Sequence, residues 1–244
     1  MEPIIIANWK MHKSHEEARA FIEALKPLLG GKKAWIAPPF TAIAEAVKAA
    51  EEAKIVIGAQ NMHDAPQGAF TGQISSSMLK ALGAQFVLIG HSECRHVFCE
   101  PEDLIRRKVV RAIEEKITPV LCIGEKLEER EADQTADVLR RQLTSALEGL
   151  SGLQDLIVAY EPVWAIGTGK VASPEMAQEA HLICRKILAE LSSEKIAAKI
   201  PILYGGSVNP KNIAGLLAQP DIEGALVGGA SLDVNSYSQL VRTS

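Results

Sequence analysis

The stretch LIVAYEPVWAIGTGK, residues 156–170, decides the fold. It begins as an apolar run rich in branched side chains, which is typical of a strand buried on both faces of a sheet. The run ends on a carboxylate, Glu161, and Pro162 keeps that residue extended, because a residue before proline avoids the helical region. A glycine-containing loop follows, and a helical pattern begins directly after it. The stretch therefore predicts a buried strand, a charge placed at its carboxyl end and a helix behind it.

Runs of the same kind recur from end to end of the chain. They predict strands at residues 4–7, 34–37, 55–58, 86–89, 120–123, 156–159, 202–204 and 225–227. Because these runs are almost continuously apolar, they favour a parallel sheet that helices cover, and not strands with one face in water.

Helical patterns separate these runs. Ser14 with Glu17 three residues later forms a capping box, which predicts a helix start. Apolar residues at helical spacing predict helices over residues 103–116 and 133–150, a long helix from 174 to about 199, and a shorter one over 210–218. Strand and helix therefore alternate throughout the chain.

This alternation over 244 residues has the size and rhythm of one fold class. It predicts an α/β protein with a (β/α)8 fold, the TIM barrel, in which eight parallel strands are surrounded by helices. No linker rich in Pro, Gly or Ser divides the chain, so we expect a single domain over residues 1–244. The alternative is a doubly wound open sheet, but the first turn, NWKMH at residues 8–12, lacks the Gly-x-Gly-x-x-Gly pattern of a dinucleotide site.

Composition excludes several classes of function. The formal net charge is −4, and charges of both signs are interspersed, so nothing favours nucleic-acid or membrane-surface binding. We expect neither an export signal nor a segment that crosses a bilayer, because the chain shows no apolar stretch of the length that either requires. The four cysteines lack Cys-x-x-Cys spacing, so we expect a cytoplasmic protein with reduced thiols. The histidines lack partners at ligand spacing, so no metal is expected.

Polar side chains at the carboxyl ends of strands are the candidate site residues of such a barrel. Alternation puts Asn8 and Lys10 on the same face as Ile4 and Ile6. A lone lysine there is more simply a residue of a solvated loop. Shared parity with Asn8 favours a functional role for Lys10.

His91 follows the fourth strand, on the face of Val87 and Ile89. The simpler interpretation is a structural histidine. A short helix beginning at Ser92, however, would disfavour the imidazolium and leave a neutral ring that donates a hydrogen bond. We therefore expect His91 to act as an electrophile and not as a base.

Glu161 ends the sixth strand on the face of Ile157 and Ala159. A carboxylate at an apolar barrel mouth should have a raised pKa, which suits a general base. The alternative is a surface glutamate paired with a nearby lysine.

Paired glycines mark the ends of the last two strands, Gly205-Gly206 and Gly228-Gly229. They allow the backbone to approach a ligand closely, and the loops after strands seven and eight are the usual phosphate site of this fold. One such pair is commonly just a turn; two pairs at the expected places favour a phosphate cradle.

Taken together, the motifs resemble those of one family. They are NWK at 8–10, GAQN at 58–61, GAFTG at 68–72, GHSE at 90–93, AYEPVWAIGTGK at 159–170, YGGSV at 204–208 and LVGGA at 226–230. In this order along nearly the whole chain, they resemble the triosephosphate isomerase family.

The resemblance implies an isomerase of glycolysis and gluconeogenesis that interconverts dihydroxyacetone phosphate and D-glyceraldehyde 3-phosphate without cofactor or metal. Glu161 would remove a proton from the carbon beside the carbonyl, and His91 would polarise the oxygens and shuttle protons as an enediolate forms. Lys10, with Asn8, would stabilise the developing negative charge and hold the substrate. Glu93 would orient Lys10.

The resemblance also implies a lid at about residues 162–172. Closure would bring the Gly167 N–H to the phosphate, where it joins Ser207, Gly228 and Gly229. Tyr204 and Ser207 would latch the closed lid, which would expel water from the enediolate.

Residues 60–75 resemble the family's long third loop, which implies a homodimer. Two residues depart from the family pattern: Gln73 stands where glutamate is common, and Cys94 where arginine is common. Both are neutral, so neither leaves a charge unpaired, and we expect the dimer to survive with a less rigid loop. Cys94 would be sensitive to thiol reagents if it were exposed.

Two other functions are alternatives to an isomerase. Another phosphate-binding barrel, such as a synthase of amino-acid or thiamine biosynthesis, would share the glycine pairs but has no need of residues 161–170. A catalytically silent binding scaffold would be expected to lack Lys10, His91 or Glu161, and all three are present.

Overall fold

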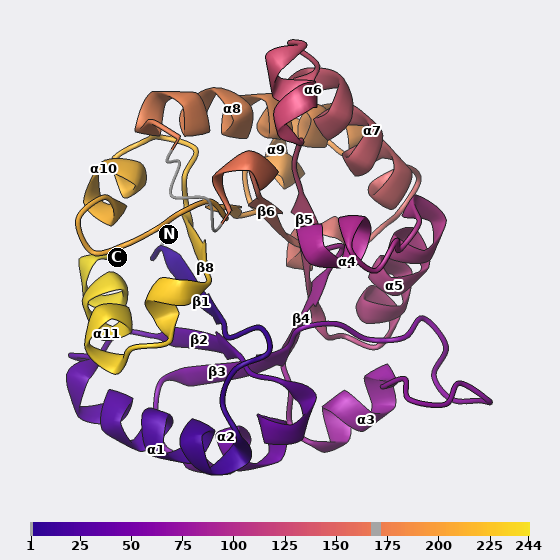
Figure 1. The fold of residues 1–244 in the computed structure, drawn as a ribbon. Coiled ribbons are helices and arrows are strands. Elements are labelled where there is room, and N and C mark those ends of the chain that lie inside the picture. Colours follow the sequence, from indigo (N-terminus) through magenta and orange to yellow (C-terminus); the bar gives the residue numbers. More distant parts are fainter. Residues whose placement is uncertain (1, 167–171) are drawn as a thin grey trace.

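The protein forms a closed barrel of parallel strands (Figure 1). The structure is a computed structural model that describes residues 2–166 and 172–244. The strands pair in sequence order, and β1 closes the barrel by pairing with β8. Their bounds are β1 Ile4–Asn8, β2 Ala34–Ala37, β3 Ile55–Ala59, β4 Phe86–Ile89, β5 Thr118–Ile123, β6 Ile157–Tyr160, β7 Ile202–Tyr204 and β8 Gly224–Val227. The predicted (β/α)8 fold is confirmed.

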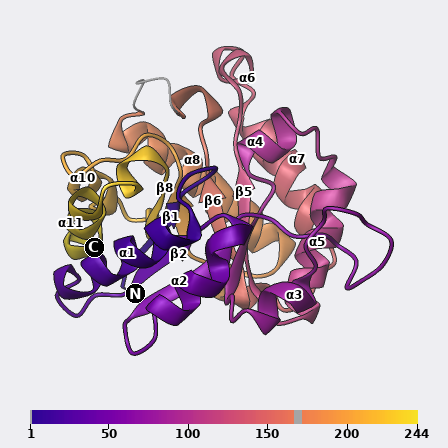
Figure 2. The same ribbon diagram turned by 60° about the horizontal axis from the view of Figure 1, so that its bottom comes forward.

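Helices surround the strands as an outer ring (Figures 1 and 2). Their bounds are α1 His15–Leu25, α2 Ile43–Ala49, α3 Ser76–Ala81, α4 Ser92–His96, α5 Glu102–Glu114, α6 Leu127–Glu131, α7 Thr135–Leu147, α8 Pro174–Leu191, α9 Glu194–Ala197, α10 Ile213–Leu217 and α11 Val234–Thr243. The predicted capping box is present at α1, where Ser14 and Glu17 bond each other's backbone N–H.

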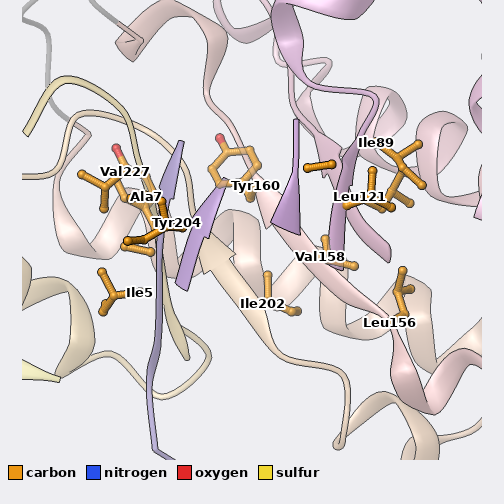
Figure 3. Packing of buried hydrophobic residues seen from close by; sticks show 14 of the residues in the cluster. Ile5, Ala7, Ile89, Leu121, Leu156, Val158, Tyr160, Ile202, Tyr204 and Val227 are labelled. Atoms are coloured by element: carbon orange, nitrogen blue, oxygen red, sulfur yellow. The ribbon is translucent and has the colours of Figure 1, made fainter. Parts of the chain in front are cut away.

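Two apolar clusters follow from strand alternation. Side chains from β1 to β8 that point inward, among them Ile6, Leu88 and Ile157, fill the barrel. Those that point outward pack against the helices, and Figure 3 labels several of them, including Val158 and Tyr160. Every strand therefore buries both faces, which is why its sequence is almost continuously apolar.

One predicted helix is wrong in extent. The helix expected from 174 to about 199 is two helices, α8 and α9, that meet at Ser192 and Ser193. The Ser192 hydroxyl donates to the Leu188 carbonyl, and Ser193 caps the start of α9 by accepting from the Ile196 N–H. Serine side chains that bond the local backbone compete with a continuous helix. The helix expected over 210–218 begins later, at Ile213.

Strand alternation does not account for the position of His91. Val87 and Ile89 belong to the outward-facing cluster, so strict alternation would send His91 outward as well. Gly90, between Ile89 and His91, has φ 71°, a left-handed conformation that breaks the alternation. His91 consequently lines the cavity at the carboxyl end of the barrel.

Within residues 2–166 and 172–244, no helix has both the length and the apolar character that a membrane span requires. The same residues contain no group of three or more His, Cys, Asp or Glu side chains placed to hold a metal ion.

Candidate active site

A cavity of about 370 Å³ opens at the carboxyl ends of the strands. Polar side chains from three strand ends enter it, and two glycine-containing loops form another part of its wall. The lining residues are Asn8, Lys10, His91, Glu161, Ile166, Gly205, Gly206, Ser207, Val208, Asn209, Leu226, Gly228, Gly229 and Ala230. The structure thus brings together the predicted site residues except three: Glu93 and Tyr204 adjoin the cavity, and Gly167 lies outside the described residues.

Glu161 is buried at the end of β6, with only 2% of its surface exposed. Its backbone N–H donates to the Ile123 carbonyl over 2.7 Å, which extends the β5–β6 pairing by one residue. One carboxylate oxygen accepts from the Ser92 N–H at 2.9 Å, and the other lies 3.1 Å from His91 Nε2. The carboxylate is therefore held on the α4 side of the cavity.

The expected rise in the Glu161 pKa is wrong for this arrangement. Burial does act to raise the pKa of Glu161, as predicted, but its neighbours outweigh burial. His91, the Ser92 N–H and Lys10 all favour the charged carboxylate. The pKa of Glu161 therefore lies below the ordinary value of a glutamate. No local sequence pattern indicates that the Ser92 amide points at this carboxylate.

His91 caps helix α4 and is itself buried. Its Nδ1 accepts the Glu93 N–H at 3.2 Å, so the neutral ring carries its proton on Nε2, the nitrogen that faces Glu161. Burial is the largest single effect and lowers the pKa of His91, but Glu161 and Glu93 together raise it by more, so the pKa of His91 lies above its ordinary value. Contact with Glu161 thus opposes the effect predicted from the helix terminus.

Lys10 occupies a left-handed conformation with φ 52° just beyond β1. Neighbouring side chains hold this uncommon backbone: Asn8 Oδ1 accepts the Lys10 N–H, and Gln60 Nε2 donates both to the Lys10 carbonyl and to that of Ala37. The ammonium lies 2.6 Å from Glu93 Oε1, as the resemblance implied. Residue 60 is a supporting residue that the sequence argument did not single out, although it stands in the GAQN motif.

The two glycine pairs serve different purposes. A Cβ at Gly205 would lie 2.7 Å from Glu161 Cγ, and one at Gly206 would lie 2.2 Å from the Tyr204 hydroxyl oxygen. Packing within the protein therefore explains the first pair without any ligand. A Cβ at Gly228 would have ordinary contacts and one at Gly229 would be in open space, so only the second pair fits the expectation of a backbone open to a ligand.

Tyr204 and Ser207 differ in exposure. Tyr204 is fully buried beneath the cavity, and burial raises the pKa of its hydroxyl to about 12. Ser207 is half-buried in the lining, and its carbonyl accepts from Asn212 Nδ2 at 3.0 Å. A neutral hydroxyl at each position is available as a donor or acceptor.

Sequence reasoning missed a buried carboxylate under the loop that follows β6. Glu125 has no exposed surface, and its Oε1 accepts from the Tyr160 hydroxyl at 3.0 Å and from Trp164 Nε1 at 2.9 Å. Burial raises the pKa of Glu125, against the effect of these donors. A carboxylate just after an apolar strand was the signal used for Glu161, and it also applied here.

The structure describes residues 162–166 and 172 of the loop that follows β6. Residues 163–165 form a short 3-10 turn in which the Ala165 N–H donates to the Pro162 carbonyl. Ala172 is buried. The rest of the expected lid, residues 167–171, lies outside the described residues.

Cys94 does not meet the condition for thiol reactivity. It is buried, and burial raises the pKa of its thiol to about 12, which leaves almost no thiolate at neutral pH. Cys99 is the exposed cysteine, and all four cysteines are free. Exposure was the condition for sensitivity of Cys94 to thiol reagents, and the buried side chain does not meet it.

Comparison with known proteins agrees with the motifs. The sequence profile of the family described as triosephosphate isomerase matches residues 3–244. The chain is 51% identical to triosephosphate isomerase of Protochlamydia amoebophila over 242 residues, which covers 98% of this chain and 92% of that protein. It is also 51% identical to the enzyme of that name from Moorella thermoacetica over 243 residues, with 98% and 97% coverage. The enzyme of Syntrophotalea carbinolica is 46% identical over 245 residues, which covers 98% of this chain and 97% of that protein.

Proposed function

The chain belongs to the triosephosphate isomerase family, and from this premise we propose how its own residues carry out the reaction. It is an isomerase of glycolysis that interconverts dihydroxyacetone phosphate and D-glyceraldehyde 3-phosphate. One observation carries the proposed mechanism: Glu161, His91 and Lys10 reach a single cavity from the ends of three different strands, β6, β4 and β1.

Glu161 is the general base of this mechanism. It takes a proton from the carbon next to the substrate carbonyl and returns it to the neighbouring carbon, through an enediolate. Its contacts with His91 and Ser92 lower its pKa, so a substrate that takes over the His91 hydrogen bond removes part of that effect. Burial then acts with less opposition and raises the pKa of Glu161 toward that of an effective base.

His91 is the electrophile. Since its Nδ1 accepts the Glu93 amide proton, the Nε2–H points into the cavity and can donate to the carbonyl oxygen. A donor aimed at the oxygen on which charge develops stabilises the transition state more than the ground state. The same nitrogen can pass a proton between the two oxygens of the enediolate.

Lys10 supplies the positive charge, with Asn8 beside it. Glu93, 2.6 Å from the ammonium, orients Lys10 toward the cavity. When substrate fills the site and displaces water, this charge interacts more strongly with an enediolate or phosphate than it would in bulk water. No step needs a metal or a cofactor.

The phosphate lies against the opposite wall in this proposal. Ser207, Gly228 and Gly229 line that part of the cavity, and backbone N–H groups there can bind a dianion. The Gly167 N–H, outside the described residues, would complete the set when a lid of about residues 162–172 closes. Tyr204 and Ser207 would latch that lid, and the exclusion of water protects the enediolate.

We also propose that residues 1–244 act as one cytoplasmic domain and pair as a homodimer through loop 60–75. Apolar side chains are exposed on and near this loop: Phe40 and Phe98 line one cavity with Gln73, and Phe70 and Met78 line a second cavity, also with Gln73. Such a concentration of exposed apolar surface is typical of an interaction site. Light scattering at micromolar concentration should give the mass of a dimer, and a monomer would contradict the proposal.

The decisive experiment compares the wild type with Glu161→Asp in a coupled assay of glyceraldehyde 3-phosphate isomerisation. Shortening the side chain by one methylene withdraws the carboxylate from the substrate carbon, and we expect kcat to fall about 100-fold or more. No activity in a folded wild type would favour the silent scaffold instead. Equal kcat in the two proteins would assign the base to another residue.

A further inference from the structure

Gln142 is a polar side chain on the buried face of a helix. It belongs to α7, where Leu139, Leu143 and Ala146 are fully buried, and only 3% of its own surface is exposed. A buried amide is stable only if its donor and acceptor find partners. Its position on an otherwise apolar stripe therefore calls for a specific partner.

That partner is a single residue, Gly124. Gln142 Oε1 accepts the Gly124 N–H at 2.8 Å, and Gln142 Nε2 donates to the Gly124 carbonyl at 3.2 Å. The side-chain amide thus replaces the contacts that a neighbouring strand would make to this residue. Both of its polar atoms are satisfied by the backbone at the end of β5.

Gly124 lies directly against the backbone of Glu161. A Cβ at position 124 would be 1.8 Å from the Glu161 carbonyl oxygen and 2.6 Å from its carbonyl carbon. The two main chains are so close that no residue with a Cβ fits at position 124. A shift of Gly124 therefore moves the backbone of Glu161.

The residues on each side of Gly124 carry the strand end that bears Glu161. The Ile123 carbonyl accepts the Glu161 N–H at 2.7 Å, and the Glu125 carbonyl accepts the Val163 N–H at 3.0 Å. Segment 123–125 is therefore the platform on which residues 161–163 rest. Its middle residue is anchored from behind, by Gln142.

We propose that Gln142 is a positioning residue for catalysis, which fixes Gly124 and through it the backbone of Glu161 at the distance that proton transfer needs. The inference rests on the proposed role of Glu161 as general base. Gln142 does not line the cavity and acts only through its two hydrogen bonds. The substrate's phosphate would contact residues on other strands, so the effect of Gln142 falls on kcat and not on KM.

The test is Gln142→Met, which keeps the length of the side chain and removes both hydrogen bonds. Since a misplacement of about 1 Å far from the chemistry costs about 100-fold, and the backbone pairing of Glu161 remains, we expect kcat to fall about 10-fold to 100-fold. KM should change less than about twofold, because uniform substrate binding is untouched. An unchanged kcat in a folded protein overturns the inference.

Gln178→Met is the matched control. Gln178 on α8 also uses both amide atoms on one residue: its Oε1 accepts the Asp221 N–H at 3.0 Å, and its Nε2 donates to the Asp221 carboxylate at 2.7 Å. Asp221 precedes β8 and so lies at the amino end of the barrel. This variant should lose thermal stability and keep kcat. An equal loss of kcat in both variants would mean that Gln142 only stabilises the fold.

A second variant, Gln142→Glu, guards against a failure of the first to fold. The charged form can accept from the Gly124 N–H but cannot donate to the Gly124 carbonyl, whereas the protonated form does both. The ratio of its kcat to that of the wild type should therefore rise toward one as the pH is lowered. A ratio that stays well below one even at low pH contradicts the positioning role.

Combination with Glu161→Asp separates this inference from the proposed function. If Gln142 acts through the position of Glu161, Gln142→Met should cost much less in the Glu161→Asp background, because that carboxylate is already displaced. Full additivity overturns the inference while leaving Glu161 as the base. A Glu161→Asp variant with wild-type kcat overturns the proposed role of Glu161 as the base.

Discussion

Two buried histidines in this protein have opposite properties. His91, 5% exposed, follows β4 at the candidate active site, and His181, fully buried, lies on α8 behind the sheet. The pKa of His91 is raised and that of His181 is lowered to about 4. Burial lowers the pKa of both, so the difference comes from what faces each ring.

A carboxylate faces His91, and mainly aromatic rings face His181. Glu161 lies 3.1 Å from His91 Nε2, whereas the ring of Tyr160 stands edge-on 5.8 Å from that of His181 and the ring of Tyr204 lies at 6.4 Å. Burial is the largest effect at His181; the Asp221 carbonyl and carboxylate raise its pKa only in part, and Arg185 lowers it further. The same residue type is therefore paired with a carboxylate at the cavity in one place and is a neutral packing element in the other.

The largest expected difference between the two histidines is in catalysis. His91→Gln removes a ring that donates a hydrogen bond at the cavity, and we expect kcat to fall about 100-fold to 10,000-fold, the usual range for an acid–base group. His181→Gln should leave kcat within about twofold, since His181 does not line the cavity. Steady-state kinetics of both variants measures the contrast. Comparable losses in the two would break the comparison.

The second expected difference is in stability against pH. Below pH 6.5 the unfolded chain protonates His181, while the folded chain keeps it neutral down to about pH 4. The unfolded state then binds more protons, so the free energy of unfolding falls as the pH drops from 6.5 to 4. Because one pKa unit is worth about 1.4 kcal/mol, this group alone should remove about 3 kcal/mol over that window.

Denaturant unfolding from pH 7 to pH 4 measures this loss. The control is His181→Gln, which has no titrating ring and whose stability should fall less steeply over the same window. His91→Gln serves as the opposite control: because the pKa of His91 is raised, its contribution to stability is present below pH 6.5 and is lost as the pH rises through the folded value. Identical pH profiles for the wild type and His181→Gln would contradict the assignment.

The two histidines also mark how far the sequence predicts this site. An apolar run ending in a polar residue predicted His91 and Glu161, because strand ends of a barrel deliver side chains to one mouth. The reason given for His91 was wrong, since the left-handed Gly90 and not strand parity turns it inward. His181 was not singled out at all, as a helical residue among apolar neighbours carries no sequence signal for a shifted pKa.

Long-range contacts explain the rest of what was missed. The lowered pKa of Glu161 depends on the Ser92 amide, 69 residues away, and the anchoring of Gly124 depends on Gln142, 18 residues away. Periodicity and capping are local, so they predicted the strands and the start of α1. Packing determines which side chain contacts which backbone group across the barrel. These long-range contacts cannot be predicted from the local patterns of a single sequence.

A third difference concerns the tautomers of the two rings. At His91, Nδ1 accepts the Glu93 N–H, so the proton is on Nε2. At His181, Nδ1 lies 2.9 Å from the Asp221 carbonyl, which can only accept, so the proton is on Nδ1. Two-bond ¹⁵N–¹H correlation spectra recorded above the raised pKa of His91, where both rings are neutral, should show opposite tautomers, with each signal assigned by its histidine variant. The same tautomer at both positions would remove the structural basis of the comparison.

The smallest expected effect tests whether the carboxylate alone separates the two rings. Glu161→Gln keeps the size of the side chain and removes its charge, and burial then acts on the His91 ring with only Glu93 to oppose it and Lys10 to reinforce it. The pKa of His91, followed by NMR titration, should move downward, in the direction of His181. The pKa of His181 should stay where it is, because Glu161 is not among the groups that shift it. If the pKa of His91 stayed raised in this variant, a source other than Glu161 would have to hold the proton, and the contrast between the two histidines would rest on the Glu93 carboxylate instead.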